Sequence, residues 1–70
     1  MKYLGSLSAI DCTLTLNIND ETLPKKWDII TCEKIRKTLA DGSLSPIYHV
    51  EAGEDKYSVY QDGEYVYVEN

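Results

Sequence analysis

The 70-residue chain is poor in the residues that build metal, redox and nucleotide sites. It has two cysteines, Cys12 and Cys32, with no CxxC spacing, and a single histidine, His49. Zinc sites and redox dithiols usually need closely paired cysteines, so the spacing argues against both. The four glycines are isolated from one another, which leaves no glycine-rich loop to hold a phosphate group. We therefore expect a protein that is not an enzyme and that uses no metal and no cofactor.

Long apolar runs are also missing. The first ten residues contain one lysine and several apolar side chains, but Asp11 ends this run well short of a signal-peptide core or a membrane span. We therefore expect no contact with a membrane and a cytoplasmic location, which is the host cytoplasm if the source is a virus. Thiols normally stay reduced there, although the sequence leaves open whether Cys12 and Cys32 ever pair.

The overall composition is that of an ordinary globular protein, with 43% apolar and 27% charged residues. A chain of this length buries only about 60% of its unfolded surface, which is near the lower limit for a single hydrophobic core. We therefore predict one small domain, residues 1–70, with little room for a buried active site.

Basic residues are almost absent from the last third of the chain, which carries the whole net charge of −5. Residues 47–70 contain six acids against Lys56 alone, whereas residues 1–46 contain six acids and six bases. Five of the six tyrosines also lie in residues 47–70. Proteins bind nucleic-acid backbones through Lys and Arg, so this distribution argues against direct nucleic-acid binding and favours a basic partner protein.

The N-terminal region shows strand patterns. Apolar and polar residues alternate from Ile10 to Ile18, which predicts a half-buried strand with Cys12 on its apolar side. Residues 2–8 are also strand-like, and Gly5 fits a turn, a bulge or the interior of a longer strand. The sequence leaves open whether residues 2–18 form one strand or a hairpin.

A helix is predicted for about residues 28–41. Four residues of apolar character recur there at helical spacing: Ile29, Cys32, Ile35 and Leu39. Gly42 follows as a residue that is free to take the left-handed conformation that ends many helices.

A three-stranded antiparallel meander is predicted for about residues 47–51, 56–61 and 64–69. Asp62 and Gly63 are typical of a two-residue hairpin turn, which sets Tyr60 opposite Tyr65. A four-residue loop at 52–55 sets Glu51 opposite Lys56. One face of this sheet is apolar and should be covered by the helix: Tyr48, Val50, Tyr57, Val59, Val66 and Val68. The predicted fold class is therefore α+β, with an N-terminal strand or hairpin, one helix and the meander.

The second face of the predicted meander carries tyrosines that the core does not need. Tyrosine is enriched at protein interfaces, and acidic surroundings steer a binding surface toward a positive partner. We expect this face and its two loops to bind a basic protein surface, such as that of a nucleic-acid-handling protein. The candidate partner-binding residues are Glu51, Glu54, Asp55, Tyr60, Asp62, Glu64, Tyr65, Tyr67 and Glu69.

In size and charge the chain resembles the small acidic inhibitors that phages use against nucleic-acid-handling machinery, including anti-CRISPR proteins and nucleic-acid mimics. This resemblance implies an inhibitor or regulator that acts by occupying a surface. Two alternatives stand beside it. Residues 33–50 resemble in their apolar spacing the helix-plus-hairpin units of excisionase-like proteins, which implies a DNA-binding accessory protein using Lys34, Arg36 and Lys37. The tyrosines can also be purely structural, as sheet contacts or as a homodimer interface.

Overall fold

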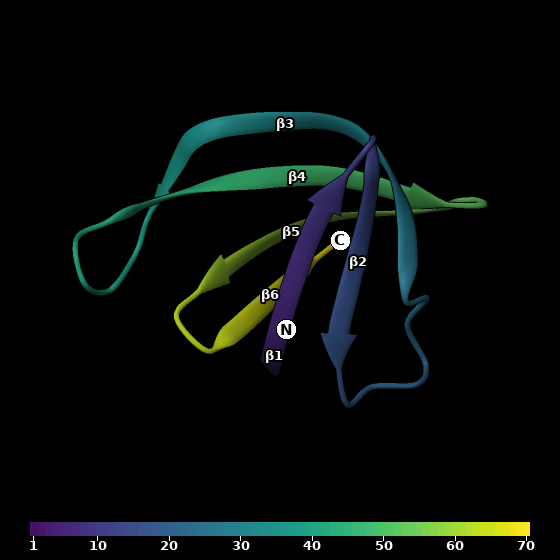
Figure 1. The fold of residues 1–70 in the computed structure, drawn as a ribbon, viewed down its shortest axis with the longest axis horizontal. Helices are drawn as coiled ribbons and strands as arrows, with labels where there is room; N and C mark the ends of the chain where they lie inside the picture. Colours follow the sequence, from purple (N-terminus) through teal and green to yellow (C-terminus); the bar gives the residue numbers. More distant parts are fainter.

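The computed structural model describes all 70 residues, which form six antiparallel strands and no helix (Figure 1). Each strand pairs with the next along the chain, and β1 pairs with β6 to close a barrel. The predicted α+β class is therefore wrong, because the protein is all-β. The strands are β1 (Lys2–Ile10), β2 (Thr13–Ile18), β3 (Lys26–Thr38), β4 (Leu44–Ala52), β5 (Asp55–Asp62) and β6 (Tyr65–Glu69).

The N-terminal region is a hairpin, which answers the question that the sequence left open. Its two-residue turn consists of Asp11 and Cys12, which both have positive φ, 51° and 61°. Positive φ at both central residues is the conformation of the turns that join tightly paired antiparallel strands. Cys12 is consequently exposed at the turn and not on a buried face, and the predicted alternation holds only from Leu14 onward.

The predicted helix at residues 28–41 is wrong, because this segment continues β3 and then enters the β3–β4 loop. Two irregularities shift the β3–β4 register, one between Ile29 and Thr31 and one between Glu33 and Lys37. Such bulges add residues to one strand and break the two-residue alternation, so the apolar spacing resembles that of a helix. Ile35 lies in the second bulge with φ 61° and 70% exposure.

The same bulged strand leaves Cys32 exposed, where a core-facing position was predicted. Gly42 does have positive φ, 85°, but it lies in the loop between β3 and β4 and caps no helix. That loop joins two long strands that extend together to one side of the barrel (Figure 1). We call the projecting part, residues 33–47, the arm.

The meander is confirmed as β4, β5 and β6, and so is the predicted pairing of Glu51 with Lys56. The connection there is a two-residue turn at 53–54, not the four-residue loop predicted. The predicted β5–β6 register is wrong by two residues, because Tyr60 pairs with Tyr67 and Asp62 pairs with Tyr65. A shift of two residues keeps every side chain on the same face of the sheet, so the predicted division into two faces survives.

The predicted apolar face of the meander lines the barrel interior. Val50, Val59 and Val66 are fully buried, and Tyr48 and Tyr57 pack against this core. Strands cover this face in place of the predicted helix, through the buried side chains of Leu14, Leu16 and Trp27.

Trp27 is the largest buried side chain and belongs to no pattern that the sequence revealed. Its indole Nε1 donates a hydrogen bond of 2.6 Å to the carbonyl oxygen of Pro24. Its ring meets the Tyr57 ring edge to face, with centroids 4.9 Å apart. Trp27 therefore fixes both the start of β3 and the interior face of β5.

Candidate functional site

The outer wall of β5 and β6 contains the tyrosines and acids that the sequence singled out. Val59, Val66 and Val68 point into the core, so their neighbours along each strand point outward. The outward residues are Ser58, Tyr60 and Asp62 on β5, and Tyr65, Tyr67 and Glu69 on β6.

Tyr60 is only 6% exposed although it lies on this outer face and outside the core cluster. Its ring stacks parallel on the Tyr67 ring at 4.8 Å, and Lys37 Nζ lies 5.7 Å from its centroid. Lys37 comes from the arm, which therefore helps to cover the outer wall. Tyr60 consequently supports its neighbours and offers almost no surface of its own to a partner.

Tyr65 is the accessible tyrosine of the face, at 40% exposure. It pairs across β1 and β6 with Leu4, which is 60% exposed. Lys2, two residues before Leu4 on the same strand, places its Nζ 4.5 Å from the centroid of the Tyr65 ring. Leu4 and Tyr65 thus form an exposed apolar pair, with one side of the ring occupied by a cation. The sequence offered no sign of this pair, because the pairing of β1 with β6 joins the two ends of the chain.

Five of the six candidate carboxylates form two groups at opposite ends of β5 (Figure 1). Asp62 pairs with Tyr65, and Glu64 is exposed in the β5–β6 turn, so both lie at the Leu4–Tyr65 pair. At the other end, around the β4–β5 turn, are Glu51, Glu54 and Asp55. Glu69, exposed on β6, pairs with Ser58 toward the middle of β5.

Burial raises the pKa of the Tyr60 hydroxyl above its ordinary value of 10.0, and the negative charges of Glu69 and Asp62 raise it further. The neutral phenol is therefore favoured in the folded protein. This group contributes stability that is present below pH 10 and is lost as the pH rises through its folded-state pKa.

We expect an alkaline titration, followed by tyrosinate absorbance, to show a late phase from Tyr60 and Tyr3. The pKa of Tyr3 is also raised, by burial and by a hydrogen bond with Asp20. Tyr60→Phe should reduce the amplitude of this late phase, and adding Tyr3→Phe should reduce it further. A late phase that is unchanged in Tyr60→Phe would contradict the burial of Tyr60.

A serine, a histidine and a carboxylate lie in line across β5, β4 and β3. Ser58 Oγ is 3.0 Å from His49 Nδ1, and Glu33 Oε1 is 3.1 Å from His49 Nε2. Nε2 is shielded from solvent and makes no well-directed hydrogen bond, although Glu33 Oε1 lies close to it. Glu33 also holds the guanidinium of Arg36 at 2.5 Å.

This line of side chains has the order of a hydrolase relay but lacks the rest of such a site. Acyl transfer needs N–H donors that are free to stabilise an oxyanion. His49 pairs with Thr31 on one side and with Ser58 on the other, and Ser58 also pairs with Glu69. Both residues therefore lie inside the sheet ladder. We therefore assign these contacts to holding the three strands in register.

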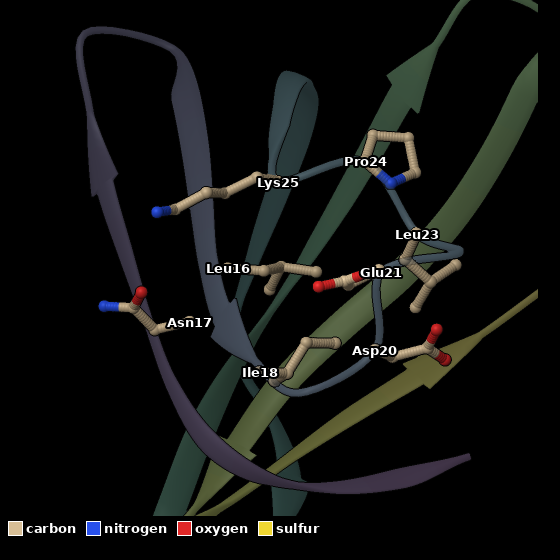
Figure 2. Close-up of a pocket in the computed structure, with 8 residues that line it drawn as sticks. All are labelled: Leu16, Asn17, Ile18, Asp20, Glu21, Leu23, Pro24 and Lys25. Atoms are coloured by element: carbon tan, nitrogen blue, oxygen red, sulfur yellow. The ribbon is translucent and has the colours of Figure 1, made fainter.

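A cavity of about 310 Å³ between β2 and the loop that follows it does not gather polar groups for chemistry. Figure 2 shows Glu21 turned toward Leu16 there, whereas Lys25 and Asn17 point away and Asp20 lies on the other side of the loop. A binding site for a small molecule usually has several polar groups converging on an apolar pocket. No group of three or more His, Cys, Asp or Glu side chains is placed to hold a metal ion.

Comparison of the chain with protein-family models, with curated proteins and with solved structures finds no match in any of the three. The structure also contains no helix with the length and apolar character to cross a membrane. The chain is thus defined by its fold as a six-stranded closed antiparallel barrel. Because one fold can carry many functions, the function has to be argued from the surface.

Proposed function

We propose that this protein is a non-enzymatic binding module of the cytoplasm that inhibits or regulates a nucleic-acid-handling protein by covering a basic surface. The observation that carries the proposal is the exposed pair of Leu4 and Tyr65 beside the carboxylates of Asp62 and Glu64. Protein interfaces commonly combine an aromatic anchor at the centre with a charged rim. Such a protein acts by occupancy, as do the phage inhibitors that the chain resembles in size and charge.

The rigidity of the site supports this proposal. Tyr65 lies on a strand that is paired on both sides, and Lys2 fixes the position of its ring. A side chain that is already ordered loses little conformational entropy when a partner binds. The carboxylates at the turn add attraction for a positive partner and speed its encounter with the site.

The alternative of an excisionase-like DNA-binding protein loses its structural basis, because no helix carries the basic residues. Lys34, Arg36 and Lys37 lie in or beside the bulge of β3. Arg36 is held by Glu33, and Lys37 lies over the Tyr60 ring, so two of the three cations are engaged within the molecule. Phosphate binding needs cations that are free to replace counterions.

The proposal is tested by capturing partners from cell lysate and identifying them by mass spectrometry at low and moderate salt. The wild-type protein is compared with the double variant Leu4→Ala/Tyr65→Ala. The control is Ile30→Ala, which removes an exposed apolar side chain from a different strand, β3. We expect a basic nucleic-acid-handling protein on the wild type and on Ile30→Ala, weakened by salt and lost from the double variant. Equal capture by all three proteins would contradict the proposed site.

The role of the acids is tested with the partner so identified. Glu64→Lys reverses a charge at the site, and Asp28→Lys makes the same change on an exposed residue near the start of β3. We expect Glu64→Lys to slow association by roughly tenfold at low salt, and Asp28→Lys to have a much smaller effect. Identical association rates for the two variants would argue against steering by this turn.

A further inference from the structure

Half of β1 has a hydrogen-bonding edge without a partner. Its pairing with β6 covers only Lys2–Leu4, whereas its pairing with β2 continues to Ile10. The N–H of Gly5 donates to the carbonyl oxygen of Glu64, on the β6 side of the strand. Successive residues of a strand direct their N–H and C=O groups to alternate sides. Leu7 and Ala9 therefore direct theirs to the same side as Gly5, where no strand continues.

Free edges on β3 and β4 are protected against pairing, whereas this edge is not. The edge of β3 beyond its pairing with β2 is interrupted by two bulges and carries Lys34, Arg36 and Lys37. The edge of β4 before Tyr48 contains Pro46, which has no N–H to donate. Bulges, cations and proline are the usual devices that prevent strands from associating. Residues 6–10 of β1 have no charge, no proline and no bulge.

Space for another strand lies beside this edge. A cleft of about 320 Å³ separates Leu7 from the arm and from the β5–β6 turn. Its wall on the arm side is mainly apolar and includes Leu39, Leu44 and Pro46. A strand that added to β1 would cover this cleft and direct alternate side chains into it.

We propose that residues 6–10 pair with the same residues of a second copy, in an antiparallel dimer with two-fold symmetry. Leu7 lies opposite Ala9 of the second copy, the axis passes between the two Ser8 residues, and the exposed Ile10 lies opposite Ser6. Each Leu7–Ala9 pair exchanges two hydrogen bonds, so the edge groups of both copies are satisfied.

The occupant is a second copy because the segment is complementary to itself. Antiparallel pairing about Ser8 puts inward residues opposite inward residues, and the absence of charge means that no like charges meet within the paired strands. A strongly charged partner segment would gain nothing from this neutral edge. The net charge of −5 on each copy opposes association at longer range, so salt should strengthen the dimer.

The test is the molar mass in solution, measured by light scattering or sedimentation over a range of concentrations. We expect the wild type to change from 8.0 kDa to twice that value as its concentration rises. Ala9→Pro removes the edge N–H and should raise the dissociation constant at least about tenfold, because the lost hydrogen bonds occur twice in the dimer. The barrel should still fold, because Ala9 directs its N–H away from β2. Ala9→Val keeps the N–H and should still dimerise.

A second variant makes the test independent of proline. Ser8→Lys places two cations opposite each other at the axis, on an exposed position of the monomer, and should also favour the monomer. A wild type that remains at 8.0 kDa at every concentration would overturn the proposal. So would dimers of equal strength in Ala9→Pro and Ala9→Val, since these would place the contact elsewhere. Partner capture through Leu4 and Tyr65 does not depend on either result.

Discussion

Replacing Gly5 with alanine is expected to prevent normal closure of the barrel. A Cβ atom at Gly5 would lie 2.0 Å from the backbone oxygen of Asn17 and 2.9 Å from Cγ2 of Ile18. The nearest obstacle is backbone, so no side chain can rotate to make room and β1 must move away from β2. Gly5 also follows the three residues that pair with β6, and its own N–H donates to Glu64. Displacing β1 therefore disturbs both of its neighbours.

We expect Gly5→Ala to lower the free energy of unfolding by about 3 kcal/mol or more, which is at the upper end for overpacked sites. Chains of this size have a total stability of only about 3 to 10 kcal/mol, so this loss is a large part of the total. Urea denaturation followed by circular dichroism measures the effect. Ser6→Ala is the control, because Ser6 is exposed on the same strand and should change stability by less than about 0.5 kcal/mol. Equal stability of the two variants would contradict the close approach of β1 and β2.

Replacing Trp27 with alanine is expected to have a similarly large effect for the opposite reason, since it leaves a cavity. Trp27 is 1% exposed, contacts Tyr57 through its ring and donates to Pro24 through Nε1. Truncating a buried tryptophan typically costs about 3 to 5 kcal/mol. Most of the stability of a 70-residue domain would be lost.

Trp27→Phe is the matched control for this prediction. It loses the hydrogen bond to Pro24 but retains an aromatic ring in the core. The loss in free energy of unfolding should therefore be clearly smaller than in Trp27→Ala. Circular dichroism is the suitable signal, because Trp27 is the only tryptophan and its fluorescence is lost in both variants. A loss below about 1 kcal/mol in Trp27→Ala would show that the side chain is not part of the core.

The C-terminal half of the fold was predictable because its signals are local. Alternation along residues 47–69 assigned each side chain to its face, and all three strands and the valine core agree with it. The turn residues were less informative. Asp62–Gly63 predicted a turn that in the structure lies one residue later, at 63–64, which shifts the pairing by two residues without changing a face.

The helix was predicted wrongly because β3 is irregular. Its bulges at Ile30 and around Ile35 break the alternation on which recognition of a strand depends. The β-branched run from Ile29 to Thr31 is a local signal that favours a strand over a helix. No local signal reveals that β3 continues into an arm whose Lys37 covers Tyr60.

The candidate site was predictable in part for the same reasons. Alternation predicted Tyr65 on the outer face of the meander, and the hairpin signal predicted Asp62 and Glu64 at the hairpin end of that face. Leu4 and Lys2 were missed, since only the pairing of β1 with β6 brings them to Tyr65. Pairing between the ends of a chain depends on closure of the whole sheet, and no periodicity along the sequence reports it.

Pairing of β1 with β6 closes the barrel and places Leu4 beside Tyr65. Nuclear Overhauser effects measured by NMR test this closure most directly. We expect cross-strand signals between Leu4 and Tyr65 and between Tyr3 and Val66, with strand-type signals along Lys26–Thr38. A continuous run of helical signals over residues 28–41, with no contact between β1 and β6, would contradict both the fold and the site built on it.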